Sequence, residues 1–244
     1  MIAHRGGGSS APENTMAALR AGVAAGYRAV EFDVMLAADG EPVLMHDEVL
    51  GRTVRGAGRV PQFTSAQLRA ADAGSWHSPA FAGEGVPLYR QALDYCLSQD
   101  VWMNVELKPA TGFEAQTGAT VARLTRQWLG AGAAGRLLFS SFSLPALRAA
   151  QQAAPDIARG WLLERLPPHW PQQAAQLGVA SLHMLHSSLS ASDARAIRAA
   201  GYGLFCYTVN TEADFRRLAA MPVDAICTDR IDRFPPQALG PPDA

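Results

Sequence analysis

The chain has 244 residues, with 21 basic and 22 acidic side chains and a formal net charge of −1. This balance excludes a general electrostatic grip on nucleic acid or on an anionic membrane as the main activity. With 48% hydrophobic residues the chain can bury a large core, and no apolar run approaches the roughly 18 residues that a membrane span needs. We therefore expect a globular protein without an integral membrane segment or a nucleic-acid partner. Its oligomeric state cannot be predicted from these quantities.

Charged residues come early in the chain, and cysteines are few. Arg5 and Glu13 leave no room for the apolar segment of a secretion signal, so we expect a cytoplasmic protein or one already trimmed. The three cysteines, Cys96, Cys206 and Cys227, lie in apolar surroundings without metal-type spacing. An odd, scattered set predicts reduced core thiols in a reducing compartment.

Short apolar runs alternate with alanine-rich helical stretches along the chain. The runs predict strands at Ile2–His4, Ala29–Val34, Val101–Leu107, Leu137–Ser141, Ala158–Leu162, Ala180–Met184, Leu204–Val209 and Ala225–Thr228. The stretches predict helices at Met16–Ala25, Tyr89–Gln99, Phe113–Leu129, Leu144–Ala153, Pro171–Leu177, Ser192–Ala200 and Glu212–Ala220. This alternation over about 250 residues predicts an α/β protein of the (β/α)8 TIM-barrel type. A doubly wound open sheet is the alternative, because alternation alone does not separate the two.

The regular alternation stops after the second predicted strand. Asp39-Gly40 is a strong hairpin-turn signal, flanked by apolar runs on both sides. We expect the second strand to continue out of the barrel, turn there and return, so that His46 arrives beside Asp33. The glycine-rich stretch 51–85 that follows is predicted to extend over the barrel mouth, where long loops are usually functional. The chain is thus expected to be a single barrel domain, 1–244, with an insertion at roughly 47–86.

Five polar side chains are predicted to point into the barrel. Because side chains alternate along a strand, Glu31 and Asp33 share one face, and the apolar residues between them take the other. The same alternation directs Asn104, Glu106 and Lys108 inward. Barrel interiors normally hold valine, isoleucine and leucine, whereas active sites lie at the C-terminal strand ends, where these five residues fall.

The three inward carboxylates, Glu31, Asp33 and Glu106, predict a metal site. Burying an unpaired carboxylate is very costly, so such groups must be paired, protonated or bound to a cation. A structural ion pair between Glu106 and Lys108 is the alternative, but one lysine does not neutralise three acids. A set made only of carboxylates suits Mg²⁺ or Ca²⁺ better than zinc.

Two histidines are predicted to reach the same mouth. His4 ends the first strand and His46 ends the returning arm of the hairpin. Two imidazoles beside three carboxylates favour acid–base catalysis, with zinc ligation as a weaker alternative. Arg5 and Lys108 add positive charge, which suits a phosphate anion better than a neutral sugar or peptide. Lys108 is the single lysine beside 20 arginines, and a compact ammonium at this site would explain its retention.

Other residues near the predicted mouth have two interpretations each. Asn14 either caps the first helix or supports the site. Tyr207 either lines the alcohol end of a substrate pocket or packs in the core. Trp76 either covers the mouth or fills the interior of the insertion. His183 is assigned to a loop or to packing.

The motifs together resemble the glycerophosphodiester phosphodiesterase family, from residue 2 to about residue 234. The opening motifs are specific, and the later ones gain weight in their company. They are Ala3-His4-Arg5-Gly6, Pro12-Glu13-Asn14-Thr15, Glu31-Phe32-Asp33-Val34, Val43 to His46-Asp47, Glu106-Leu107-Lys108 and Tyr207-Thr208-Val209-Asn210.

The resemblance implies a TIM-type barrel and a metal-dependent hydrolase that converts a glycerophosphodiester to sn-glycerol 3-phosphate and an alcohol. The attacking group is either the glycerol 2-hydroxyl or water. The family often has tryptophan where Tyr207 stands, a substrate-lining position. Carried over by position, His4 and His46 become the acid–base pair, Glu31, Asp33 and Glu106 the ligands of one Mg²⁺ or Ca²⁺, and Arg5 and Lys108 the phosphate-binding groups.

Two other functions are compatible with the same residues. The first is a lysophospholipid-directed phosphodiesterase of the lysophospholipase D type on the same barrel, which predicts a wide apolar trough at the mouth. The second is a non-catalytic phosphate-binding barrel. It predicts that the acid–base groups are missing, yet His4 and His46 are both present.

Overall fold

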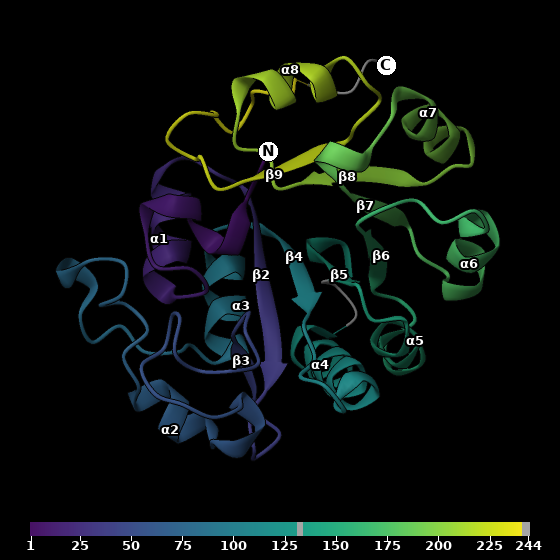
Figure 1. Ribbon diagram of the computed structural model, residues 1–244. Helices are drawn as coiled ribbons and strands as arrows, with labels where there is room; N and C mark the ends of the chain where they lie inside the picture. The colour runs from purple at the N-terminus through teal and green to yellow at the C-terminus, as the bar shows by residue number, and fades with distance from the viewer. Residues whose placement is uncertain (131–133, 241–244) are drawn as a thin grey trace.

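The computed structural model of this chain describes residues 1–130 and 134–240. Within these residues, eight parallel strands follow one another in the order β1-β9-β8-β7-β6-β5-β4-β2, and the pairing of β1 with β2 closes the ring (Figure 1). The predicted TIM barrel is confirmed, and the open sheet is excluded. The barrel strands are β1 (Ile2–Ala3), β2 (Ala29–Leu36), β4 (Trp102–Leu107), β5 (Leu137–Ser141), β6 (Ala158–Leu163), β7 (Ser181–Leu185), β8 (Gly203–Tyr207) and β9 (Ala225–Thr228).

Each predicted helix lies within one residue of its expected bounds and packs outside the ring of strands (Figure 1). Side-chain caps explain several starts, since Ser143, Ser190 and Thr211 each accept a hydrogen bond from a backbone N–H of the first turn. The helices are α1 (Met16–Ala24), α3 (Tyr89–Ser98), α4 (Glu114–Leu129), α5 (Leu144–Ala153), α6 (Trp170–Leu177), α7 (Ala191–Ala199) and α8 (Glu212–Ala219).

Apolar packing outside the barrel determines which residues of β2 point inward. Val30, Phe32 and Val34 are completely buried, and the Phe32 ring lies 6.2 Å from the Tyr89 ring of α3. Burial of each large apolar side chain contributes about 1.5–3 kcal/mol. A one-residue slip would turn this whole face inward, so the packing holds the acids between these residues on the interior face.

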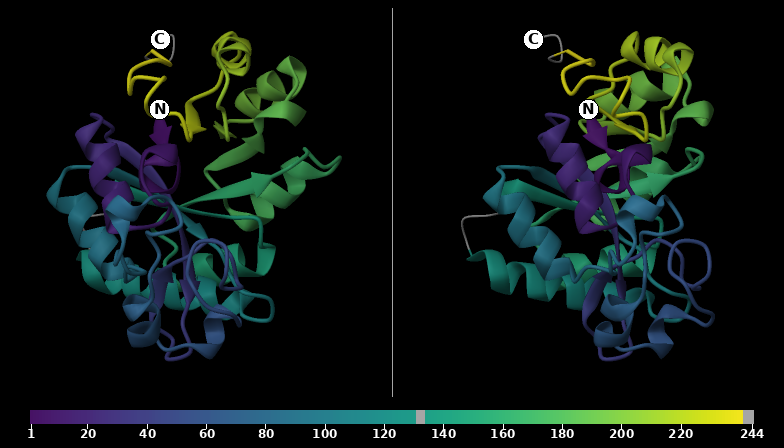
Figure 2. Two further views of the ribbon diagram at one scale, coloured as in Figure 1. Left: turned by 60° about the vertical axis from the view of Figure 1, so that its left-hand side comes forward. Right: turned by 90° about the vertical axis from the view of Figure 1, so that its left-hand side faces the viewer.

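The first strand is only two residues long, yet it is well anchored. Ala3 pairs with Val30 of β2 and with Thr228 of β9. The amino group of Met1 donates to the Pro236 carbonyl at 3.1 Å, so the chain's first residues lie against the segment that follows β9 (Figure 2). Because β1 pairs with a strand on each side, the position of His4 directly after it is fixed.

The predicted hairpin is present. β3 (Pro42–Leu44) runs antiparallel to β2, with Val34 opposite Leu44. Gly40 adopts a φ of +77°, which suits glycine in the tight turn. The Met45 N–H donates to the Asp33 carbonyl at 3.1 Å, and this bond brings His46 back to the barrel mouth.

The insertion is more ordered than the sequence analysis predicts, and it lies beside the mouth. It contains α2 (Ser65–Ala70), and its buried apolar residues pack against Met35 of β2 and Val43 of β3. Residues 51–85 contribute nothing to the lining of the main cavity, so the expectation that they cover it is wrong. Trp76 and His77 instead line a neighbouring depression, together with His4 and Arg5.

Two further expectations concern the chain as a whole. The cysteines are unpaired and buried, as predicted, at Cys96, Cys206 and Cys227. Across the described ranges, we find no helix with the length and apolar character that crossing a bilayer would require.

Candidate active site

Three buried carboxylates meet at the C-terminal end of β2 and β4. Glu31, Asp33 and Glu106 are 4%, 1% and 9% exposed. Each offers an oxygen within 4.8 Å of the others. The parallel register places Asp33 opposite Glu106 and Glu31 opposite Asn104, so the predicted convergence of the acids is present.

The electrostatics of this cluster favour a cation. Burial, together with the charge of Asp33, raises the pKa of Glu31 to about 8 and that of Glu106 to about 7. Burial also acts to raise the pKa of Asp33, but the nearby positive charges, led by Arg5, hold it below its ordinary value. Lys108 pairs with Glu106 at 3.0 Å, yet Oε1 of Glu31 stays buried without a hydrogen-bond partner. The ion pair alone therefore does not satisfy the three acids.

Asn14 supports the cluster and does not cap α1. Its amide donates to Oδ2 of Asp33 at 2.8 Å and accepts from the Asp33 backbone N–H at 3.0 Å. Thr15 is the N-cap, because its side chain accepts from the Ala18 N–H. The site-support interpretation of Asn14 is confirmed, and it explains why this buried amide faces a carboxylate.

His4 is held by a carboxylate from the far end of the chain. Its Nδ1 donates to Asp229 at 2.6 Å, and Asp229 in turn accepts from the Asn210 amide at 2.8 Å. Nε2 lies 3.7 Å from Glu31. Burial lowers the pKa of His4, but the hydrogen bond to Asp229 and the charge of Glu31 outweigh it and raise the pKa above its ordinary value.

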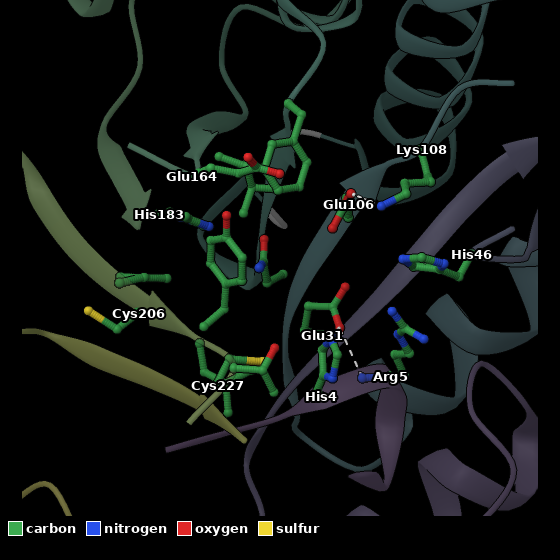
Figure 3. Close-up of a pocket in the computed structure, with 17 residues that line it drawn as sticks. His4, Arg5, Glu31, His46, Glu106, Lys108, Glu164, His183, Cys206 and Cys227 are labelled. Atoms are coloured by element: carbon green, nitrogen blue, oxygen red, sulfur yellow. Dashed lines mark hydrogen bonds and ion pairs between the residues drawn. The ribbon is translucent and has the colours of Figure 1, made fainter. Parts of the chain in front are cut away.

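His46 is held by its sequence neighbour. Its Nδ1 donates to Asp47 at 2.6 Å, which directs Nε2 away from that carboxylate. Burial, together with the positive charges of Arg5 and Lys108, lowers the pKa of His46 more than the charge of Asp33 and the bond to Asp47 raise it. His4 and His46 line the same cavity (Figure 3), so the predicted pair does share one mouth.

The two predicted phosphate-binding residues border this cavity as well. The Arg5 backbone N–H donates to Glu31 at 2.9 Å, and its guanidinium pairs with Glu13 at 2.6 Å. Arg5 has left-handed backbone angles (φ 49°), a strained conformation of the kind found at functional sites. The Lys108 ammonium lies 5.5 Å from the centre of the Phe142 ring.

The cavity has a volume of about 410 Å³ and two unlike sides. Arg5, His46 and Lys108 lie on one side, and His183 lies opposite them (Figure 3). His183 comes from the interior of β7 and stacks on Phe205 with 4.5 Å between ring centres, so its packing role is confirmed.

Tyr207 forms part of the cavity wall. Its hydroxyl donates to the Leu163 carbonyl at 3.1 Å, and its ring meets Phe142 edge-on at 5.9 Å. The side chain therefore both packs and lines the pocket.

The sequence analysis assigned no role to Asp229 or Arg52. Asp229 directly follows β9 and therefore lies at the C-terminal end of a barrel strand, a signal that could have identified it. Arg52 lies in the insertion and contacts Asp47 and Glu13. Nothing in the local sequence indicated these contacts.

One mouth of the closed barrel holds three converging acids, two imidazoles held by carboxylates, and the basic side chains of Arg5 and Lys108. This fold and this site define the class of TIM-barrel phosphoric diester hydrolases. Residues 4–233 match the model of the glycerophosphoryl diester phosphodiesterase family. The chain belongs to this family, and the resemblance predicted from its motifs is confirmed.

Individual relatives agree with this assignment. A glycerophosphodiester phosphodiesterase of Caldanaerobacter subterraneus is 30% identical over 94% of this chain and 93% of that protein. An Oleispira antarctica phosphodiesterase, solved in complex with its product sn-glycerol-3-phosphate, is 36% identical with a TM-score of 0.89, over 97% of this chain and 94% of that one. A putative glycerophosphoryl diester phosphodiesterase from Silicibacter pomeroyi is 28% identical with a TM-score of 0.85, over 98% and 91% of the two chains.

Proposed function

We propose that this enzyme hydrolyses glycerophosphodiesters to sn-glycerol 3-phosphate and an alcohol in a metal-dependent reaction, with His4 and His46 as the general acid–base pair. The observation that carries the proposal is that both imidazoles face the cavity of the buried acids, each held by a carboxylate at 2.6 Å. The product complex of the Oleispira antarctica relative supports the choice of substrate.

Glu31, Asp33 and Glu106 would hold one Mg²⁺ or Ca²⁺. Their oxygens lie within 4.8 Å of one another, and the unpartnered Oε1 of Glu31 is the kind of buried acceptor that a cation satisfies. A hard divalent cation held there would supply positive charge to the nonbridging phosphate oxygens and orient the diester.

Two basic side chains of the protein would complete phosphate binding. Lys108 provides a compact ammonium beside Glu106, and Arg5 a planar guanidinium at the cavity edge. Both positive charges offset the negative charge of the phosphodiester, which would otherwise repel a nucleophile. The Tyr207 ring forms part of the wall against which the substrate would pack.

Proton transfer would be divided between the two imidazoles. One accepts the proton of the attacking hydroxyl, and the other protonates the departing alcohol. Attack by water gives sn-glycerol 3-phosphate directly, whereas attack by the glycerol 2-hydroxyl gives a cyclic phosphate that a water molecule then opens in a second step. Because Nδ1 of each ring is committed to a carboxylate, Nε2 is the nitrogen that exchanges the proton in His4 and in His46.

The metal site can be tested by titrating the metal-free protein with Mg²⁺ or Ca²⁺ in buffers of different ionisation enthalpy. Since the raised pKa values of Glu31 and Glu106 keep protons on these acids near neutral pH, binding should release protons, and affinity should rise between about pH 6 and pH 8. Glu106→Gln should weaken binding and proton release, whereas Glu212→Gln on the exposed face of α8 should change neither. Unaltered titration of Glu106→Gln would rule out this ligand set.

Lys108→Arg tests the phosphate-binding role with the charge retained. The Lys108 ammonium contacts Glu106 at 3.0 Å. Because the larger, planar guanidinium differs from it in shape and hydrogen-bond geometry, we expect kcat/KM to fall about tenfold. Full activity of this variant would show that a compact ammonium is not needed.

The substrate class can be tested by comparing kcat/KM for glycerophosphocholine and lysophosphatidylcholine. We expect a preference for glycerophosphocholine. A preference for the lysophospholipid would instead establish the lysophospholipase D-type alternative.

We also propose that the chain works as one barrel domain with the insertion at 47–86, since the insertion shares its apolar core with β2 and β3. The unpaired thiols fit a reducing, cytoplasmic environment.

A further inference from the structure

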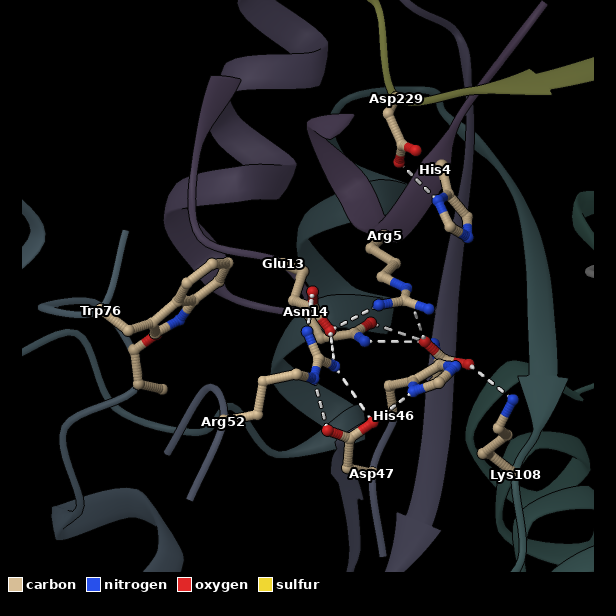
Figure 4. Close-up of polar contacts among 12 residues, drawn as sticks. His4, Arg5, Glu13, Asn14, His46, Asp47, Arg52, Trp76, Lys108 and Asp229 are labelled. Atoms are coloured by element: carbon tan, nitrogen blue, oxygen red, sulfur yellow. Dashed lines mark hydrogen bonds and ion pairs between the residues drawn. The ribbon is translucent and has the colours of Figure 1, made fainter. Parts of the chain in front are cut away.

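Arg52, in the insertion, bridges two carboxylates with four hydrogen bonds (Figure 4). Its Nε and Nη2 donate to the two oxygens of Asp47 at 2.5 and 3.0 Å. Its Nη1 and Nη2 donate to the two oxygens of Glu13 at 2.8 and 2.7 Å. One guanidinium thus engages two acids in bidentate fashion, a geometry that only arginine provides.

Each of these acids contacts a residue of the proposed machinery. Asp47 accepts from Nδ1 of His46 at 2.6 Å, and Glu13 accepts from Nη1 of Arg5 at 2.6 Å. The five side chains form a continuous chain of hydrogen bonds that links two residues on the same side of the cavity: His46, Asp47, Arg52, Glu13 and Arg5 (Figure 4).

Arg52 itself stands outside the cavity. Its side chain is 47% exposed, and it is absent from the cavity lining. The hydrogen bond from Arg52 is the main cause that lowers the pKa of Asp47 to about 2, so Asp47 stays ionised as an acceptor for His46. Arg52 therefore touches the proposed machinery through its two carboxylate partners and not directly.

We propose that Arg52 is a positioning residue that fixes His46 and Arg5 relative to each other. Through Asp47 it orients the imidazole, and through Glu13 it orients the phosphate-binding guanidinium. This is how the insertion takes part in catalysis without lining the cavity. The inference rests on the proposed roles of His46 and Arg5.

An ordinary surface ion pair is the competing interpretation. Exposed pairs usually contribute little to folding stability, so both interpretations expect Arg52→Ala to fold. They differ in the kinetics, because misplacement of a catalytic group by about 1 Å can cost on the order of 100-fold in rate. A comparison of the kcat and the melting temperature of Arg52→Ala with those of the wild type therefore separates the two interpretations.

The experiment measures kcat, KM and melting temperature for Arg52→Ala, Arg52→Lys and Arg55→Ala, with glycerophosphocholine as substrate. Arg55 is an exposed arginine three positions along the same loop, and no hydrogen bond or ion pair joins its side chain to another described residue. We expect kcat to fall about 10- to 100-fold in Arg52→Ala, with partial recovery in Arg52→Lys and no change in Arg55→Ala. The melting temperature should fall only slightly in the two Arg52 variants, which stay folded at the assay temperature, and should not change in Arg55→Ala. Wild-type kcat in Arg52→Ala would overturn the inference.

A double-mutant cycle shows whether Arg52 acts through Asp47. If it does, Arg52→Ala combined with Asp47→Ala should lose much less kcat than the product of the two single losses, with only the part that runs through Glu13 added to the effect of Asp47→Ala. If the loss of kcat in the double variant equals the product of the losses in the two single variants, the inference is overturned. Should Arg52→Ala fail to fold, Arg52→Lys replaces it in the cycle.

His46→Ala serves as the reference for the proposed function. If this variant keeps full kcat, the proposed acid–base role of His46 is wrong, and the positioning role of Arg52 fails with it. If it is inactive while Arg52→Ala is normal, only the positioning role of Arg52 fails.

Discussion

The two histidines of the active site are supported by different parts of the molecule. His4 follows β1, and its partner Asp229 follows β9, so the barrel wall builds this half of the pair. His46 follows the returning hairpin strand, and its partner Asp47 is held by Arg52 of the insertion. One imidazole thus depends on the barrel strands for its position, and the other follows the hairpin strand β3 and depends on the insertion for its support.

Their electrostatic surroundings differ accordingly. The pKa of His4 is raised, because Asp229 and the buried Glu31 outweigh the effect of burial. The pKa of His46 is lowered, because burial and the positive charges of Arg5 and Lys108 together outweigh the charge of Asp33 and the hydrogen bond to Asp47. Two groups that differ in this way can serve opposite roles in proton transfer.

The largest expected effect is loss of either imidazole. His4→Ala and His46→Ala should each lower kcat by about 10²- to 10⁴-fold, the usual contribution of a positioned acid or base. Substrates with a good and a poor leaving group separate the roles. The variant that lacks the acid should recover on glycerophospho-4-nitrophenol, since that leaving group departs without a proton, whereas the variant that lacks the base should not. Equal recovery of both variants would contradict a divided acid–base pair.

The next effect concerns the carboxylates that hold the two rings. Asp229→Asn and Asp47→Asn should each lower kcat about 10- to 100-fold, because the imidazoles lose their orienting acceptor. The hydrogen bond to Asp229 is the main cause that raises the pKa of His4, whereas Asp47 is a minor cause at His46. An NMR titration should therefore find the larger downward pKa shift at His4. A larger shift at His46 would reverse the comparison.

The smallest expected effect is at His183, the third imidazole of the cavity. Burial lowers its pKa to about 3, and Ser181 is its hydrogen-bond partner. We expect His183→Gln to change kcat by much less than the roughly 100-fold minimum of an acid–base residue. A loss comparable to that of His46→Ala would show that the cavity uses three imidazoles.

Acid unfolding provides a second measurement on His183. Between about pH 6.5 and pH 3 the unfolded chain binds a proton on this ring that the folded protein does not, so acidification lowers stability through this group. His183→Gln should reduce that dependence by up to about 1.4 kcal/mol per pH unit. Urea unfolding at several pH values measures it, and an unchanged slope would mean that the ring also titrates when folded.

Local alternation explains the successful predictions of the site. Val30, Phe32 and Val34 must pack against helices, and therefore Glu31 and Asp33 must point inward. The rule that parallel strands end at one edge then brings these acids to a common mouth. Neither step needs information from distant parts of the chain.

The errors have identifiable causes. Helix α2 was missed although Thr64 and Gln67 form a capping box directly at its start. The insertion was expected over the mouth because long loops often lie there. Its position beside the mouth depends on apolar contacts with Met35 and Val43, which the sequence pattern does not specify.

The sequence by itself determined the alternating strands and helices, the inward acids and the two histidines at strand ends, because these depend on the side-chain period of a strand and on chain direction. Only the tertiary structure decided that Asp229 holds His4 across 225 positions and that Arg52 joins Asp47 to Glu13. Such partners come close in space only after the barrel has closed, and the spacing of residues along the chain does not specify that closeness.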